Sequence, residues 1–204
     1  MAALKNKNQK LKQKKAVKKA LPAKKKAVAR KAVGAVKQAR LVARPAGQDL
    51  QHQVEQFLYN QAQLLDAKQW QGFIDQFAED GVYWAAVDPH HSHWDGVPSI
   101  FTEDRDLMTV RMKRVLNPNA WSQQAEWGTS HIVSNVVIEE VFGDEVHVRS
   151  RFHMLEMRRD DLRHFAGTYR HQLRKTADGW RIQLQRVDML NAQMPFEYVL
   201  QVWV

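Results

Sequence analysis

His131 is the residue of this chain best suited to acid–base chemistry. It stands at the head of an apolar run in the stretch EWGTSHIVSNVVIEEVFGDEVHVRSRFHMLEM, residues 126–157. On a strand facing an internal cavity, its imidazole could act as a general base with Tyr83, Asn135 or Tyr169, because a histidine titrates near neutral pH. The simpler interpretation is a core histidine that bonds a backbone carbonyl or a neighbouring strand. We therefore predict no catalytic residue in this chain, and His131, Tyr83 and Asn135 are the catalytic set only if the chain acts alone.

Three groups of donor residues could bind a metal by residue type alone. The segment HHSHWD supplies four donors on a loop bounded by proline and glycine, without a rigid support: His90, His91, His93 and Asp95. Asp161 and His164 begin a pattern typical of iron sites, but His171 follows seven residues later instead of five, so the spacing fails. His147 and His153 share the polar face of one predicted strand, which favours a surface or a subunit contact. The sequence therefore predicts neither a metal site nor a cofactor site.

Cysteine is absent from the 204 residues. This absence excludes disulfides, thiolate catalysis and cysteine-ligated metal centres within the chain. No apolar run approaches the roughly 20 residues that span a bilayer, and the basic N-terminus lacks the apolar segment of a signal peptide. We expect a cytoplasmic protein that does not associate with membranes.

The net charge of +9 averages two unlike parts. Residues 1–48 contain 16 Lys and Arg and no Asp or Glu, which leaves 15 basic and 22 acidic residues, a net charge of −7, in residues 49–204. The first part is a Lys/Ala-rich tail that cannot bury enough surface to fold, so we predict disorder over 1–48 and one folded domain over 49–204. The tail could bind nucleic acid phosphates, anionic lipid or an acidic partner, but it lacks the interleaved aromatic residues that bind single-stranded bases. We expect a solvated extension.

Hydrophobic periodicity predicts helices in the first half of the domain and strands in the second. Helices are expected at residues 49–70, 68–80 and 102–117, with Gly81 ending the second and Thr102 capping the third. Strands are expected at residues 82–87, on both sides of a turn at Gly143 and Asp144, on both sides of the turn TADG at 176–179, and at the C-terminus. The apolar parity shifts after Leu184 to Val187, which indicates a bulge or a bend. Helices followed by antiparallel strands form an α+β fold, in which one bent sheet wraps around the helices.

Four blocks of the domain resemble one known family, in the same order along the chain. They are LYNQAQLLDAKQWQGFIDQFAEDGVYWAAV, FTEDRDLMTVRMKRVLNPNAWSQ, TSHIVSNVVI and GWRIQLQRVDML. They are similar to the small (β) subunits of aromatic-ring-hydroxylating dioxygenases, and the resemblance covers residues 50–204. Two features depart from the family pattern. GTSH stands where the family has more basic residues before the histidine that corresponds to His131, and the lysine-rich tail is not typical.

The resemblance implies a fold, a function and a set of partners. The fold is the cone-shaped cystatin-like roll of nuclear transport factor 2, with a curved antiparallel sheet packed on N-terminal helices. The chain would be a structural, non-catalytic small subunit that forms a homotrimer and organises an α3β3 oxygenase for the catabolism of aromatic compounds. The large (α) subunit would carry a Rieske [2Fe-2S] cluster and a mononuclear non-haem Fe(II), and NADH would supply electrons through a reductase, sometimes with a ferredoxin. Expected contact surfaces are the strand face with Arg149, Arg151 and His153, and the C-terminal strand Tyr198–Val204.

Two hypotheses from other classes stay open. The chain could be a stand-alone isomerase, dehydratase or polyketide-cyclase-like enzyme of the same roll that uses His131. It could also be a binding module that its tail tethers to nucleic acid, although we do not expect nucleic acid as the partner. The sequence does not specify an aromatic substrate.

Overall fold

The computed structural model describes residues 46–120, 127–196 and 199–204. The predicted tail, residues 1–48, lies outside the described residues except for its last three positions. Those three positions begin the first helix. None of the helices in the described part has the length and the apolar character that crossing a bilayer requires.

All three predicted helices are present, but the predicted end of the second and the predicted cap of the third are wrong. The helices are α1 (Ala46–Asp66), α2 (Trp70–Asp75) and α3 (Arg105–Leu116). Helix α3 begins after Asp104, whose carboxylate accepts the backbone N–H of Leu107 at 2.9 Å. Asp104 is therefore the N-cap, because its oxygen satisfies an amide that the first helical turn leaves free. Thr102, the predicted cap, lies in strand β2.

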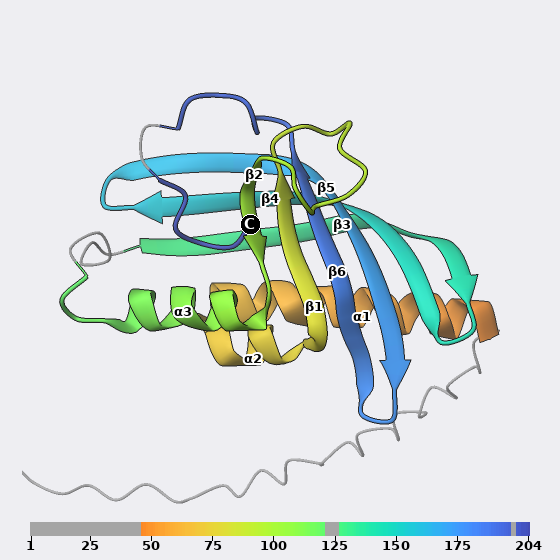
Figure 1. Ribbon diagram of the computed structural model, residues 1–204. Coiled ribbons are helices and arrows are strands. Elements are labelled where there is room, and N and C mark those ends of the chain that lie inside the picture. The colour runs from red at the N-terminus through yellow and green to blue at the C-terminus, as the bar shows by residue number, and fades with distance from the viewer. Residues whose placement is uncertain (1–45, 121–126, 197–198) are drawn as a thin grey trace, which may run out of the picture. The chain divides into compact units, whose positions relative to one another are not determined.

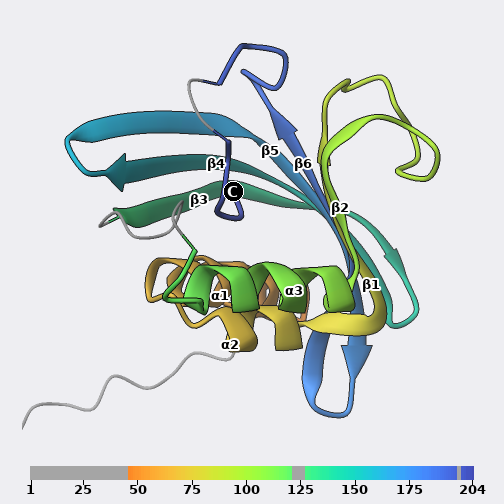
Figure 2. The ribbon, with the colours of Figure 1, turned by 60° about the vertical axis from the view of Figure 1, so that its left-hand side comes forward.

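Six strands form one curved sheet in the order β2-β1-β6-β5-β4-β3. Their bounds are β1 (Phe77–Ala86), β2 (Ser99–Glu103), β3 (Trp127–Phe142), β4 (Glu145–Arg158), β5 (Asp161–Thr176) and β6 (Gly179–Met189). The sheet bends so that its inner face looks onto the three helices (Figures 1 and 2). This arrangement confirms the predicted α+β class with a curved sheet packed on N-terminal helices. The sheet is mixed, because β1 pairs with β6 in parallel while the other pairs are antiparallel.

The hairpins follow the predicted turns. Gly143 has φ of +59°, a conformation that glycine adopts readily, and it joins β3 to β4. In the second hairpin, β5 pairs with β6 up to Thr176 and Gly179. The predicted bulge is confirmed one residue earlier than expected. Leu173 pairs with Ile182 and Gln172 with Leu184, so Gln183 is the extra residue.

Gly81 lies within a strand and does not end a helix. The second helix stops at Asp75, and β1 begins two residues later at Phe77. A Cβ atom at position 81 would approach the carbonyl oxygen of Ile182 to 2.5 Å, so only glycine lets β1 come this close to β6. The sequence predicts Gly81 as the residue that ends a helix. In the structure its role is to leave space for the backbone of β6, because it has no side chain.

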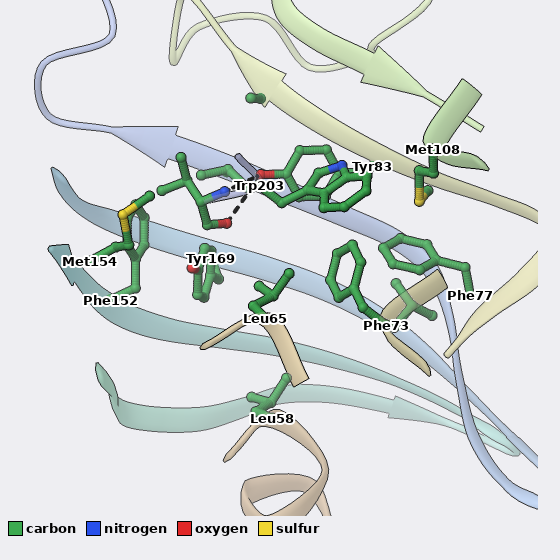
Figure 3. Close-up of a cluster of buried hydrophobic side chains, with 14 of the residues drawn as sticks. Leu58, Leu65, Phe73, Phe77, Tyr83, Met108, Phe152, Met154, Tyr169 and Trp203 are labelled. Atoms are coloured by element: carbon green, nitrogen blue, oxygen red, sulfur yellow. Dashed lines mark hydrogen bonds between the residues drawn. The ribbon is translucent and has the colours of Figure 1, made fainter. Parts of the chain in front are cut away.

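The C-terminal segment packs inside the protein. Residues 199–204 form no strand, yet four of their side chains are buried: Leu200, Val202, Trp203 and Val204. Figure 3 shows Trp203 among core side chains that come from the helices and from the sheet. The prediction of an exposed contact strand at Tyr198–Val204 is therefore wrong for these four residues, because the core of the same chain already buries them.

Candidate functional site

Asp66 and His131 form the carboxylate–imidazole pair that the described residues offer as an acid–base centre. Asp66 is the last residue of α1, and His131 lies on the edge strand β3. The carboxylate Oδ1 lies 2.6 Å from His131 Nδ1 and 3.0 Å from the hydroxyl of Thr129, which donates to it. The other oxygen accepts the backbone N–H of His131 at 2.9 Å. The pair was not visible in the sequence, because its members are 65 residues apart.

The electrostatics of the pair fix which nitrogen of His131 is basic. Burial by itself raises the pKa of Asp66, but hydrogen bonds from the side chain and the backbone of His131 outweigh burial and hold this pKa below its ordinary value. The carboxylate is therefore ionised at neutral pH and accepts the Nδ1 proton, so the lone pair of the neutral imidazole form lies on Nε2. Only 1% of the His131 side chain is exposed, and its Nε2 has no hydrogen-bond partner among the described residues. The pair has the carboxylate–imidazole arrangement of a general base, but no described group lies within hydrogen-bond reach of Nε2 to give up a proton.

The other members of the predicted catalytic set do not join His131. Asn135 is exposed on β3 with φ of +50°, at the bulge where pairing shifts from Ser134 to Val137. Tyr83 is buried, and its hydroxyl donates to the carbonyl of Val204 at 3.1 Å and accepts the backbone N–H of Val204 at 3.0 Å (Figure 3). Burial raises the pKa of Tyr83 well above its ordinary value, so its hydroxyl stays protonated. The C-terminal segment thus engages the phenol that the alternative hypothesis needed.

Tyr169, the remaining candidate partner of His131, is also part of the core. Its ring stacks on Phe152 with the ring centroids 4.2 Å apart. Burial raises the pKa of its hydroxyl well above the ordinary value. A tyrosine in this setting contributes packing and has no ready proton to exchange near neutral pH.

Side chains of α1 and of the turn after it form hydrogen bonds with backbone groups on the free edge of β3. An edge strand leaves backbone groups that can pair with another chain unless they are covered. Gln51 donates to the carbonyl of Val136 at 2.8 Å, Lys68 donates to the carbonyl of Trp127 at 2.6 Å, and Asp66 accepts the N–H of His131. The Asp66–His131 pair belongs to this row of contacts, which holds the helix along the strand.

An open groove of about 380 Å³ lies beside the pair, between α1 and β3. Tyr59, Gln63 and Ile132 line it together with the pair itself. Asp66 is partly exposed there, but the Nε2 atom of His131 is buried. The groove therefore gives access to the carboxylate and not to the basic nitrogen.

Arg111 and Glu103 hold the C-terminal segment in the core. The guanidinium of Arg111 forms an ion pair with the buried carboxylate of Glu103 and lies over the ring of Phe101, 4.0 Å from its centroid. The other oxygen of Glu103 accepts the indole N–H of Trp203 at 3.0 Å. This anchor was not predicted from the sequence, because Glu103 and Arg111 both fall in the segment predicted as one helix.

The structure does not bring together the donor residues of the candidate loop site or of the Asp161, His164 and His171 pattern. Asp161 and His164 are exposed near the start of β5, whereas His171 is buried further along the strand, on the face opposite to His164. On the loop after β1, His93 Nδ1 accepts the backbone N–H of Asp95 at 3.0 Å. Among the residues that the structure describes, no three His, Cys, Asp or Glu side chains lie close enough together to hold a metal ion.

The outer face of the sheet carries a row of arginines that the sequence reasoning found only in part. Arg149, Arg170 and Arg186 are direct cross-strand neighbours on β4, β5 and β6. Like charges in this position repel each other, and two carboxylates separate them. Glu139 bonds Arg149 at 2.5 Å and Arg170 at 3.5 Å, and Asp188 lies 3.7 Å from Arg170 and 2.8 Å from Arg186. The row is a ladder of alternating charge, which can meet a polar partner surface.

Known proteins with similar sequences and structures point to one family. Residues 60–195 match the family model described as "Ring hydroxylating beta subunit". The chain is 29% identical over 161 residues to the biphenyl 2,3-dioxygenase subunit beta of Rhodococcus jostii (strain RHA1), a match that covers 73% of this chain and 85% of that protein. It is 30% identical over 150 residues to the anthranilate 1,2-dioxygenase small subunit of Acinetobacter baylyi, covering 70% of this chain and 91% of that protein.

A solved structure agrees with these sequence relatives. The beta subunit of the benzoate 1,2-dioxygenase from Burkholderia mallei superposes with a TM-score of 0.59 at 26% sequence identity. The superposition covers 72% of this chain and 95% of that one. The similarity therefore extends over nearly the whole of that subunit.

Proposed function

This chain belongs to the ring-hydroxylating beta-subunit family, and from that premise we propose that it carries no catalytic residue and organises an α3β3 oxygenase around a trimer of its own copies. It is the structural small subunit of an aromatic-ring-hydroxylating dioxygenase. The large oxygenase subunit is its partner. The proposal extends to the electron supply: the large subunit would carry a Rieske cluster and a non-haem iron, and NADH would supply electrons through a reductase.

The observation that carries the proposal is the setting of His131. Its basic nitrogen is buried and faces no group that it can deprotonate, and Val204 engages the hydroxyl of Tyr83. A general base must come within hydrogen-bond reach of the proton that it removes. The absence of cysteine supports the same conclusion, because a Rieske cluster needs two cysteine ligands.

We place the subunit contacts on the outer face of the sheet, where Arg149, Arg151 and His153 lie. These three side chains alternate along β4 with buried ones, so they point away from the core of their own chain. Arginine suits such contacts, because its planar guanidinium can make two hydrogen bonds to one carboxylate.

Expression of the chain with and without its large subunit tests the proposal. We expect a complex of both subunits, with iron bound by the large one, that hydroxylates an aromatic compound only when both are present in the assembly. The chain purified alone should turn over neither an aromatic compound nor a small ketone. Enzymatic turnover of a ketone by the isolated chain would support the isomerase hypothesis and refute ours.

His131→Ala should weaken the subunit without stopping the reaction. The substitution removes the hydrogen bond between Asp66 and the imidazole, and we expect the free energy of unfolding to fall by about 1–3 kcal/mol. Turnover per iron in the assembled complex should stay close to that of the unsubstituted protein. Ser130→Ala, an exposed neighbour on the same strand, is the control and should change neither quantity. A His131→Ala complex with full subunit and iron content but no turnover would mean that the imidazole takes part in catalysis.

Deleting residues 1–45 should leave assembly and turnover unchanged. These residues precede α1, and we propose that they form a solvated extension of the folded domain. Size-exclusion chromatography and turnover of the shortened complex check this expectation. If the shortened chain no longer joins the large subunit, the basic segment has a structural task in the complex.

A further inference from the structure

Two histidines on the outer face of the sheet contact each other. His153 on β4 pairs with Ala166 of β5, and Leu155, two residues along, pairs with His164. The two histidines are therefore diagonal cross-strand neighbours. Nδ1 of His153 lies 2.9 Å from Nε2 of His164, and the ring centroids are 5.1 Å apart. Both residues are exposed.

This pair differs from the two histidines whose rings bond carboxylates. His131 bonds the carboxylate of Asp66, and His147 lies between the carboxylates of Glu140 and Glu145. Within the described part of the chain, His153 and His164 bond only each other. Two imidazole nitrogens at this distance can serve as neighbouring ligands of one transition-metal ion once the proton between them has moved.

We propose that His153 and His164 together bind one divalent transition-metal ion, with Cu²⁺ and Ni²⁺ preferred over Zn²⁺. Metal–imidazole bonds are about 2.0–2.1 Å long, so two nitrogens in adjacent positions at a right angle are separated by about 2.9 Å. The observed 2.9 Å matches that separation. A tetrahedral ion needs a wider one, of roughly 3.3–3.4 Å. The tetragonal geometry of Cu²⁺ and Ni²⁺ therefore fits the pair best.

Binding needs a small rearrangement with a balanced proton. One ring now donates its N–H to the other, so that proton must move to the second nitrogen of the same ring when both facing nitrogens take the metal. The rings must also turn from facing each other to facing a common point. Exposed side chains turn easily, and the neighbours Ile132 and Leu162 are themselves 61% and 66% exposed. Coordination positions that the pair does not fill stay open to water or to a donor atom of a neighbouring subunit.

Copper held by nitrilotriacetate is the probe that tests the site on the full chain. The chelator occupies four positions of the ion and leaves two adjacent ones to water, which a correctly spaced pair of ligands replaces more tightly than one ligand does. We expect the unsubstituted chain to bind one equivalent with nitrogen coordination in the electron paramagnetic resonance spectrum. His153→Gln and His164→Gln should each weaken this binding by at least about tenfold, equivalent to 1.4 kcal/mol.

The matched control replaces the histidines of the loop after β1. A variant with His90, His91 and His93 all replaced by glutamine should keep the equivalent that depends on His153 and His164. The probe should also raise the melting temperature of the unsubstituted chain and of this control, but not of the two single variants, because a ligand that binds only the folded state stabilises it. The proposal is overturned if the single variants bind the probe as tightly as the unsubstituted chain, or if only one of them loses binding.

Discussion

Trp203→Ala should lower the free energy of unfolding by about 3–5 kcal/mol, the range typical of removing a buried tryptophan or phenylalanine. The ring is 1% exposed and lies 5.1 Å from the ring of Phe73 and 5.9 Å from that of Trp70, measured between centroids. Alanine leaves a cavity between α2 and the sheet. It also removes the indole N–H that donates to the buried carboxylate of Glu103. The ion pair of Glu103 with Arg111 remains.

Two further variants separate packing from hydrogen bonding at this position. Trp203→Phe keeps much of the ring but loses the N–H, and we expect a smaller loss of about 1.5–3 kcal/mol, the value of a hydrogen bond to a charged group. Val199→Ala, at an exposed position of the same segment, should change stability by less than about 0.5 kcal/mol. Chemical denaturation of the three variants checks these values. A loss below 1 kcal/mol for Trp203→Ala would show that the C-terminal segment does not depend on this anchor.

Acid should destabilise the domain through His171. This histidine is 1% exposed, and burial lowers its pKa to about 3, an effect that the neighbouring Gln185 partly opposes. In the unfolded chain the same side chain titrates near its ordinary pKa of 6.5. Between pH 6.5 and 3, His171 is therefore protonated in the unfolded state and neutral in the folded state. Stability is complete above pH 6.5 and falls by about 1.4 kcal/mol for each pH unit below it, until the folded state also titrates near pH 3.

His171→Leu should remove this component of the pH dependence. Leucine has no charged form, so the curve of unfolding free energy against pH should flatten between pH 6.5 and 3. At neutral pH the variant should be at least as stable as the unsubstituted chain, because Gln185 lies beside the His171 ring without making a hydrogen bond of normal geometry to either nitrogen. His90→Leu, on an exposed loop, is the control and should keep the original slope. An unchanged slope in His171→Leu would assign the acid sensitivity to other groups.

The elements that the sequence predicted best are those whose signals are local. Val54, Leu58 and Leu65 recur at helical spacing and are buried on one side of α1. Val146, Val148, Phe152 and Met154 alternate along β4 and face the core, as predicted. The predicted ends were less accurate: the helix expected over 68–80 gives way to β1 at Phe77, because pairing with β6 outweighs the helical pattern there.

The candidate site shows the same division. The sequence identified His131 but not Asp66 as its partner, and it placed Asn135 beside His131 although a bulge turns Asn135 to the surface. It recognised His153 and His164 separately and did not bring them together. The His153–His164 contact depends on strand register, which contacts with the neighbouring strand set, and the Asp66–His131 contact depends on how α1 packs along β3. A single segment of sequence reveals neither.

The amino-acid sequence by itself determined the α+β class, most of the helices and hairpins, the family and the absence of cysteine chemistry, because periodicity, turn residues and composition act over a few neighbouring positions. Only the tertiary structure decided that β1 lies parallel to β6, that residues 199–204 fill the core, and that α1 holds the edge of β3 through Asp66. Each of these joins segments tens of residues apart. Their physical cause is the burial of apolar surface and the need to satisfy every buried polar group, and these conditions apply only when the whole domain is assembled.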